Sequence, residues 1–335
     1  MIDPHVHLRD WNQSDKETVE HGINQALSAG IDCLFDMPNT DPPILHRDEV
    51  IKRLKLGEKV CEKSKTYYHL YIGLTFDKDQ IKQAVELYNE FFPRVIGLKM
   101  FVSNSTGNMG ILNLENQKEM YCILKALNYT GVLAVHCENE SFFNLNEYNN
   151  SLKRPSKAEV DAVRNQIKFA KETGFKGNLH ICHISTPEAL NLVKAARKKI
   201  KITCGITAHH ALFNMEGENR NLRMNPPLRS RVEQEKMLEE LEKGTIDWVE
   251  SDHAPHTIVD KSKGACGIAG FANILRLVKE LKKFCGDDQL KALFGENVKK
   301  TFKIEDKVNY DFSLENIDQR IKNLDDQYKV DIIKY

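Results

Sequence analysis

Short apolar segments alternate along this chain with segments whose apolar residues recur every three or four positions. The short segments have the length of β-strands, and the others have the spacing of amphipathic helices. Helices are predicted at 18–29, 79–92, 158–173 and 272–284, and another begins at 186–188, where a threonine N-cap precedes a proline. Strands are predicted within 1–10 and at 31–37, 67–74, 95–101, 132–137, 178–183, 202–207 and 246–252.

This alternation of strand and helix is maintained over eight units. It favours the α/β class and, within it, a (β/α)8 TIM barrel over a doubly wound sheet. We expect residues 1–300 to form the barrel. No substantial flanking β-sandwich is expected, because the sequence opens directly at the first strand. The polar tail 301–335 is expected to pack on the outside of the barrel as a helix.

Composition narrows the class of protein. Of the 335 residues 41% are hydrophobic, which is enough for a large core, and 48 basic residues balance 48 acidic ones. No overall field would draw the chain to nucleic acid or to an anionic membrane. No apolar run is long enough to span a bilayer, and the eight cysteines are spaced singly. We therefore expect a cytoplasmic protein with reduced cysteines that acts on a small molecule.

Residues able to bind a metal or move a proton stand at the ends of the predicted strands. His5 and His7 lie on one face of the first strand because side chains alternate along it. Active sites of (β/α)8 barrels lie at the carboxyl ends of the strands. Each residue alone could be a core or solvated residue, but together they indicate one catalytic rim. The other members are Lys99, His136, His183 and Asp252.

This set predicts a centre for divalent ions, and its imidazole and oxygen ligands favour zinc. Protonated Lys99 has no lone pair for a metal and could simply pair with a carboxylate. If burial and nearby cations lower its pKa, the neutral amine can react with carbon dioxide to give a bridging carbamate. The number of ions and the carboxylation of Lys99 stay open. One ion would be held by His5, His7, Lys99 and Asp252, and the other by Lys99, His136 and His183.

Seven motifs in order resemble those of dihydroorotases, in the amidohydrolase superfamily of metal-dependent hydrolases. The resemblance covers residues 2 to about 300 and implies the interconversion of N-carbamoyl-L-aspartate and L-dihydroorotate in pyrimidine biosynthesis. It also implies the metal ligands named above. The motifs are Asp3-Pro4-His5-Val6-His7-Leu8-Arg9, Met37-Pro38-Asn39-Thr40, Gly97-Leu98-Lys99, His136-Cys137-Glu138, His183-Ile184-Ser185, Asn225-Pro226-Pro227-Leu228-Arg229 and Asp252-His253-Ala254-Pro255-His256.

The resemblance also implies how the substrate is held. Arg9, Asn39, Asn225 and His256 would bind its carboxylate and ring amide, with backbone contacts from Cys266 and Gly267. A guanidinium is a suitable planar partner for a carboxylate. Asp252 would be the catalytic acid and base, taking a proton from the attacking water and passing it to the leaving nitrogen. In the loop 103–107, either Ser105 or Thr106 donates to substrate, or the loop is merely solvated.

Some positions depart from the family pattern. Gly205 stands where many relatives have glutamate, and Ala272-Asn273 replaces the usual Glu-Thr; either change could alter loop packing or substrate fit. The remaining histidines of the strands and of the His-His pair are expected to be structural. They are His69, His180, His209 and His210.

Two other functions stay open. The chain could be another cyclic amidase, of the dihydropyrimidinase or allantoinase kind, although such substrates lack the carboxylate that Arg9 would bind. It could also be an inactive barrel that serves as a structural partner of aspartate transcarbamoylase, although all six ligands are present. A homodimer and an association of the active enzyme with aspartate transcarbamoylase are further expectations.

Overall fold

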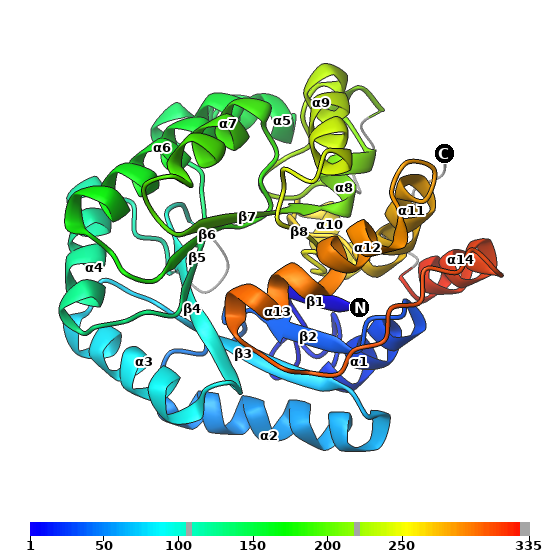
Figure 1. Cartoon of the computed structure of the whole chain (residues 1–335), viewed down its shortest axis with the longest axis horizontal. Coiled ribbons are helices and arrows are strands. Elements are labelled where there is room, and N and C mark those ends of the chain that lie inside the picture. The colour runs from blue at the N-terminus through cyan, green and yellow to red at the C-terminus, as the bar shows by residue number, and fades with distance from the viewer. Residues whose placement is uncertain (105–108, 218–221, 329–335) are drawn as a thin grey trace.

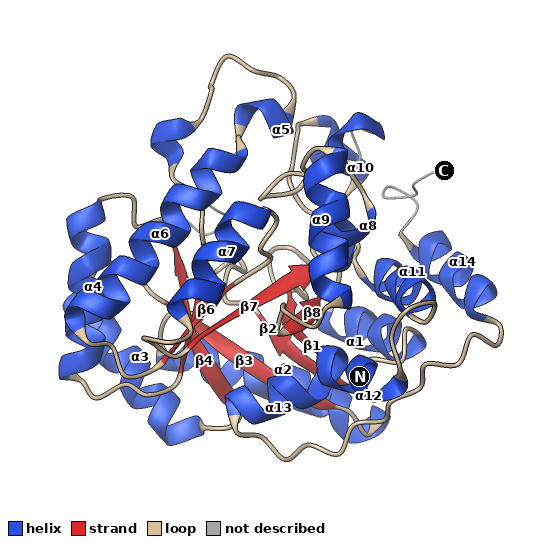
Figure 2. Cartoon of the chain, turned by 45° about the horizontal axis from the view of Figure 1, so that its top comes forward, coloured by secondary structure: helices blue, strands red, loops and turns tan. Residues whose placement is uncertain are grey.

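The computed structural model describes residues 1–104, 109–217 and 222–328. Its eight strands form one parallel sheet in the order of the sequence, as expected for a (β/α)8 barrel. Figure 1 shows the ring of helices around these strands, and Figure 2 shows the strands inside the helical layer. The strands are β1 (Ile2–Val6), β2 (Cys33–Asp36), β3 (Tyr67–Gly73), β4 (Val95–Phe101), β5 (Val132–His136), β6 (Asn178–Ile181), β7 (Ile202–Thr207) and β8 (Trp248–Glu250).

The two ends of the sheet meet just beyond β1 and β8. The amide of His7 donates to the carbonyl oxygen of His253 at 2.8 Å, and Val6 and His253 form a parallel bridge. This contact joins residues 246 positions apart in the sequence and closes the barrel. The described residues contain no second sheet.

Helices follow the strands and cover the outside of the barrel. The predicted start of the helix after β6 is confirmed, since the Thr186 hydroxyl accepts from the Ala189 amide and Pro187 is the first helical residue. The helices are α1 (Val19–Ser28), α2 (Arg47–Ser64), α3 (Lys78–Phe91), α4 (Leu114–Ala126), η1 (Glu140–Phe142), α5 (Asn150–Lys153), α6 (Ser156–Thr173), α7 (Pro187–Ala196), α8 (Ala208–Leu212), η2 (Met215–Gly217), α9 (Arg231–Glu242), α10 (Ile258–Ser262), α11 (Phe271–Leu281), α12 (Asp287–Lys291), η4 (Ala292–Glu296), α13 (Asn297–Phe302) and α14 (Ile317–Gln327).

Some boundaries differ from the prediction. The strand predicted at 246–252 is only Trp248–Glu250, and that at 178–183 ends at Ile181. The chain leaves the ladder there, because Asp252 and His183 adopt positive φ values of 47° and 36°. Helices α2, α4 and α9 were not predicted from the sequence. Their long charged stretches leave only a narrow apolar stripe, which weakens the periodic signal.

The core has two main layers. One lies between strands and helices, and the other fills the barrel interior with Phe35, Tyr71, Trp248 and Phe302. The tail after α13 runs past the starts of the first strands, as the orange trace in Figure 1 shows. It ends in α14, which packs on α11. No helix in the described part of the chain combines the length and apolar surface that a membrane crossing requires.

Gly57 lets α2 approach β3, because a Cβ at this position would lie 2.4 Å from the Tyr68 ring. We expect Gly57→Ala to lower the free energy of unfolding by about 1–3 kcal/mol through overpacking. Alanine would gain about 1 kcal/mol at an open helical site. Exposed Lys59 in the same helix gives the control, Lys59→Ala, which should change stability by less than about 0.5 kcal/mol. Urea unfolding measures both, and equal stability of the two variants would contradict the packing argument.

Candidate functional site

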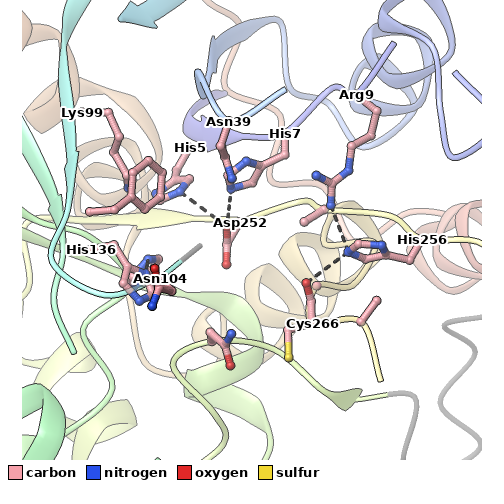
Figure 3. Close-up of a pocket in the computed structure, with 16 residues that line it drawn as sticks. His5, His7, Arg9, Asn39, Lys99, Asn104, His136, Asp252, His256 and Cys266 are labelled. Carbon is pink, nitrogen blue, oxygen red and sulfur yellow. Dashed lines mark hydrogen bonds and ion pairs between the residues drawn. The ribbon is translucent and has the colours of Figure 1, made fainter. Parts of the chain in front are cut away.

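One pocket at the carboxyl ends of the strands gathers the residues selected from the sequence (Figure 3). Its volume is about 190 Å³, which suits a ligand smaller than a typical drug. Phe101, Asn104, Ala254 and Ala265 also line it and were given no function from the sequence. The predicted residues that line it are His5, His7, Arg9, Asn39, Lys99, His136, His183, Asn225, Asp252, His256, Cys266 and Gly267.

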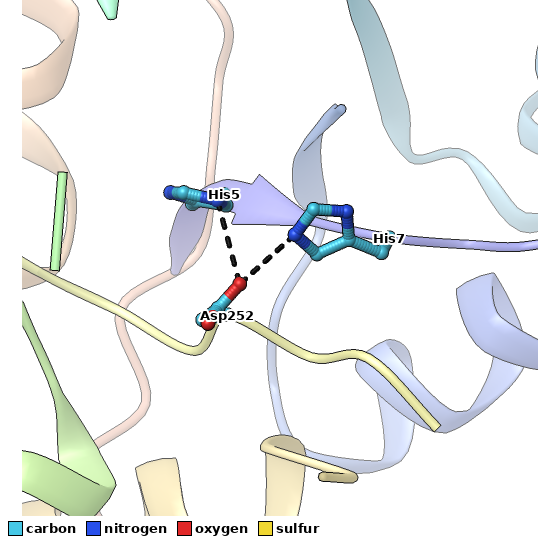
Figure 4. A group of neighbouring side chains, drawn as sticks. All are labelled: His5, His7 and Asp252. Carbon is cyan, nitrogen blue, oxygen red and sulfur yellow. Dashed lines mark hydrogen bonds and ion pairs between the residues drawn. The ribbon is translucent and has the colours of Figure 1, made fainter. Parts of the chain in front are cut away.

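Barrel closure brings His5, His7 and Asp252 together (Figure 4). Asp252 Oδ1 lies 2.9 Å from His7 Nε2 and 3.4 Å from His5 Nε2. One ligand atom from each residue lies within 4.8 Å of the others. Burial alone would raise the pKa of Asp252, but the His7 hydrogen bond and the charge of His5 lower it well below its usual range. Asp252 is therefore ionised and available as a ligand or base.

The other three predicted ligands lie next to this group. His136 Nδ1 is 3.0 Å from His183 Nε2, and the ring centres of His183 and His5 are 5.2 Å apart. Lys99 is fully buried, and its Nζ donates to Cys182 Sγ at 3.1 Å. Among the described residues no carboxylate forms an ion pair with Lys99, so the alternative of a lysine–carboxylate pair has no support there.

Glu250, at the end of β8, contacts two of the predicted metal ligands, His5 and His183, without lining the pocket itself. Its Oε1 lies 3.3 Å from His5 Nδ1 and accepts from the backbone amide of His183. With Nδ1 turned towards Glu250, His5 directs Nε2 into the pocket. Sequence reasoning missed this residue. The available signal was its position two residues before Asp252, on the same face of the strand predicted at 246–252.

Gly205 on β7 makes room for the Glu250 carboxylate. A Cβ at position 205 would lie 2.4 Å from Glu250 Oε2 and 2.8 Å from Trp248 Nε1. Gly205 departs from the family pattern in a way that could alter packing. The structure explains it, since a carboxylate from β8 fills the space that a side chain on β7 would occupy.

Glu138 performs the corresponding function for His136. Its Oε2 lies 3.0 Å from His136 Nε2, which leaves Nδ1 facing His183. The Arg154 Nε donates to both Glu138 oxygens at 3.1 Å. Burial alone would raise the pKa of Glu138, but Arg154 and His136 lower it to about 2. The Glu138 motif was recognised in the sequence without a function, and Arg154 was missed.

The arrangement fits a bound cation. His7 Nδ1 and His183 Nδ1 are buried and make no hydrogen bond to the described residues. The nitrogens of His136 and His183 face each other across 3.0 Å, and two further imidazoles face one carboxylate oxygen. Imidazole and carboxylate are ligands that zinc accepts. His183 and Asp252 are also held at positive φ, a strain that is common at functional sites.

The opposite wall of the pocket is built around Arg9, which is 3% exposed. Its Nη2 lies 3.1 Å from His256 Nε2, and its Nε donates to the Pro255 carbonyl at 3.2 Å. Burial and the charge of Arg9 lower the pKa of His256 to about 3, so this imidazole is neutral. The Asn39 Oδ1 is buried without a hydrogen bond to the described residues. This wall therefore offers a cation and free polar atoms to a ligand.

A buried ion pair fixes the backbone that carries Arg9. Arg53 Nε donates to Asp36 Oδ2 at 2.8 Å, and Arg53 Nη1 donates to the Arg9 carbonyl at 2.7 Å. Asp36 Oδ1 accepts from the Leu8 amide at 3.1 Å. Arg9 adopts a φ of 45°, so these bonds hold a conformation that the residue disfavours alone. Arg53 was not found from the sequence because α2 itself was missed.

Other predicted details have mixed outcomes. His180 contacts Glu250 at 3.4 Å, and His210 Nε2 lies 3.0 Å from the Pro226 carbonyl, so both side chains have partners within the protein. His209 is buried with neither ring nitrogen hydrogen-bonded to a described residue. Ser105 and Thr106, proposed as donors in the loop 103–107, lie outside the described residues. All eight cysteines lie within the described ranges and are free.

Comparisons with known proteins show to which family the chain belongs. A scan against models of protein families finds no match. Curated relatives are named dihydroorotase. The one from Thermococcus kodakarensis is 32% identical over 281 residues, which cover 83% of this chain and 61% of that relative. The one from Lactobacillus gasseri is 30% identical over 327 residues, which cover 91% of this chain and 73% of that relative. The chain belongs to the dihydroorotase family.

Solved structures agree with this family in fold. An L-hydantoinase (dihydropyrimidinase) from Arthrobacter aurescens matches with a TM-score of 0.80 at 22% identity, over 92% of this chain and 71% of that chain. Dihydroorotase from Saccharomyces cerevisiae in complex with 5-fluoroorotic acid matches with a TM-score of 0.72 at 18% identity, over 91% and 85%. The chain nevertheless spans only about three fifths of the archaeal dihydroorotases, at 61% of the Thermococcus protein.

The fit of Gly205 against Glu250 can be tested through metal affinity. Gly205→Ala should displace the Glu250 carboxylate from His5 and weaken the binding of added Zn²⁺, used as a probe, by about 10–100-fold, as is typical when a metal ligand loses its supporting partner. Glu250→Gln should weaken binding to a similar extent. Competition with a chromogenic chelator measures the affinity, with circular dichroism as the folding control. Unchanged affinity in both folded variants would contradict the positioning by Glu250.

Proposed function

We propose that this chain catalyses the dihydroorotase reaction, the reversible interconversion of L-dihydroorotate and N-carbamoyl-L-aspartate, with zinc. The observation that carries the proposal is one pocket with metal-type ligands on one wall and buried Arg9 on the other. A cyclic amide with a carboxylate needs both. The family relationship supports the same reaction.

The proposed centre would hold two zinc ions through the predicted ligands, with Lys99 acting after carboxylation of its side-chain nitrogen. Ligand atoms of His5, His7 and Asp252 lie within 4.8 Å of one another, whereas among the described residues no such group of three contains both His136 and His183. A carbamate on buried Lys99 would supply a third ligand there. When bound, the ions would activate water and polarise the amide carbonyl.

The chain's own residues would orient the substrate and move the proton. Arg9 would pair with the substrate carboxylate and Asn39 would accept from a ring N–H, helped by Asn225, His256 and the backbone at Cys266 and Gly267. Asp252 is ionised at neutral pH and would take the proton of the attacking water, then deliver it to the departing ring nitrogen. In the cyclisation direction it would accept the ureido proton.

A change at Asp252 tests the proton transfer. Asp252→Asn should retain the fold and lose about 10²–10⁴-fold in kcat, because the amide cannot accept the proton. His5→Ala should lose turnover together with zinc. Dihydroorotate hydrolysis and the reverse cyclisation are assayed with and without chelator. After chelation, added zinc should restore activity to the wild-type protein but not to the variants. Normal turnover by either folded variant would refute the assignment.

Arg9 distinguishes dihydroorotase from the hydantoinase or allantoinase alternative. Arg9→Met should lower kcat/KM for dihydroorotate by about 10²-fold, because the carboxylate loses its charged partner. Hydantoin and allantoin carry no carboxylate, so slow turnover of these compounds should be unaffected. If wild-type protein prefers hydantoin or allantoin, the other cyclic amidase activity is the correct one. If it turns over none of the three with zinc bound, the inactive partner of aspartate transcarbamoylase is favoured.

The expected assembly stays a prediction. We propose a homodimer and an association with aspartate transcarbamoylase as arrangements to be measured by sedimentation of the protein alone and with that enzyme.

A further inference from the structure

A second group of metal-type ligands lies at the amino-terminal end of the barrel. Cys33 begins β2, His69 lies near the start of β3, and Asp306 belongs to the tail after α13. One ligand atom from each lies within 4.8 Å of the others. We call these three residues the floor cluster. From the sequence, His69 is expected to be structural and Cys33 has no predicted function.

The floor cluster is separate from the pocket. Cys33 pairs with Ile2 and Tyr67 at the starts of their strands, whereas the pocket lies beyond the opposite strand ends. The Phe35 ring packs edge-on against His69, with 5.1 Å between ring centres. The aromatic layer of the barrel interior therefore stands above the floor cluster.

His69 turns its Nε2 atom towards the other members of the floor cluster. His69 Nδ1 lies 2.7 Å from the Pro93 carbonyl oxygen, which can only accept, so Nδ1 carries the proton. Nε2 of His69 therefore faces Asp306 Oδ2, 2.7 Å away. A cation between these two atoms, either a proton or a metal ion, satisfies both of them. An N–H directed at a backbone carbonyl is also how metal-bound histidines are usually oriented.

The spacing approaches that of a tetrahedral zinc site. Zinc lies about 2.0–2.3 Å from nitrogen, oxygen and sulfur ligands, so neighbouring ligand atoms are about 3.3–3.6 Å apart. The Cys33 thiol and Asp306 Oδ2 are 3.6 Å apart, which already fits. His69 and Asp306 would separate by about 0.6 Å, a small side-chain movement. Asp306 is 16% exposed, so solvent can reach the fourth position.

The residues of the floor cluster are largely buried, and the segment that carries Asp306 is anchored nearby. Cys33 is fully buried and His69 is 5% exposed. Burial and the charge of Asp306 raise the pKa of the Cys33 thiol well above its usual range, so the thiol stays protonated until a cation replaces the proton. Next to the cluster, the Asn309 amide donates to Asp32 Oδ2 at 2.8 Å. The tail that supplies Asp306 is thus already fixed against β2.

We propose that the floor cluster binds a zinc-like divalent ion through Cys33 Sγ, His69 Nε2 and Asp306 Oδ2, with water as fourth ligand. The thiol proton leaves to solvent when the ion binds. The ion joins β2 and β3 to the tail and so adds a second attachment of the tail to the barrel floor, beside the bond from Asn309 to Asp32. This site is independent of the proposed reaction in the pocket.

Cobalt distinguishes the two sites, because the proposed pocket ligands include no thiolate. Reduced protein loaded with Co²⁺ should show thiolate-to-cobalt charge-transfer absorption. Cys33→Ser should abolish this band and reduce bound cobalt by one ion per chain. Asp306→Asn should weaken cobalt binding at the floor cluster by at least 10-fold. His5→Ala, which disrupts the pocket, should leave the band unchanged.

Two matched variants control for other thiols. Cys204→Ser replaces a buried cysteine of β7 that belongs to neither the pocket lining nor the floor cluster, and Cys182→Ser removes the thiol that contacts Lys99. Both should retain the band. Its absence from the wild-type protein, its survival in Cys33→Ser or its loss in Cys182→Ser would overturn the proposal. If Cys33→Ser fails to fold, His69→Gln provides the same test, with loss of the band expected and its full retention contradictory.

Discussion

Closure of the barrel between β1 and β8 is the constraint on which the rest depends. The bond from the His7 amide to the His253 carbonyl joins chain segments 246 residues apart. It places His5 and His7 against Asp252, and Arg9 against His256. Without it the two walls of the pocket would separate, because each draws residues from both ends of the barrel sequence.

A layer of buried charged residues fixes the orientation of the side chains that barrel closure brings together. Glu250 holds His5 and the His183 backbone, Glu138 orients His136, and Arg53 holds the Arg9 carbonyl. Each buried charge has a charged or hydrogen-bonding partner, as burial in a medium of low dielectric requires. These residues do not line the pocket, yet they determine which ring nitrogens and which guanidinium edge point into it. Gly205 contributes to this layer because the absence of a side chain there leaves space for the Glu250 carboxylate.

The sequence predicted much of the fold and the pocket because the signals are local. Strand alternation places His5 and His7 on one face, and the βα count places Lys99, His136, His183 and Asp252 at one end. Helices α2, α4 and α9 were not predicted, because each buries only a narrow stripe of apolar residues within a charged sequence. Arg53 lies on α2 and was therefore not predicted either. Its contribution is its contact with Asp36 and with the Arg9 backbone.

The sequence by itself determined the eight-unit barrel, the family motifs and the identity of the residues at the strand ends. Only the tertiary structure decided that Glu250 fills the space beside Gly205, because β7 and β8 pair across 43 residues of sequence from Gly205 to Trp248. It also decided that Asp306 meets Cys33 and His69, which no local pattern connects. Periodicity records which face of an element is buried. It does not record which distant side chain will share that face, since this depends on how the whole chain packs.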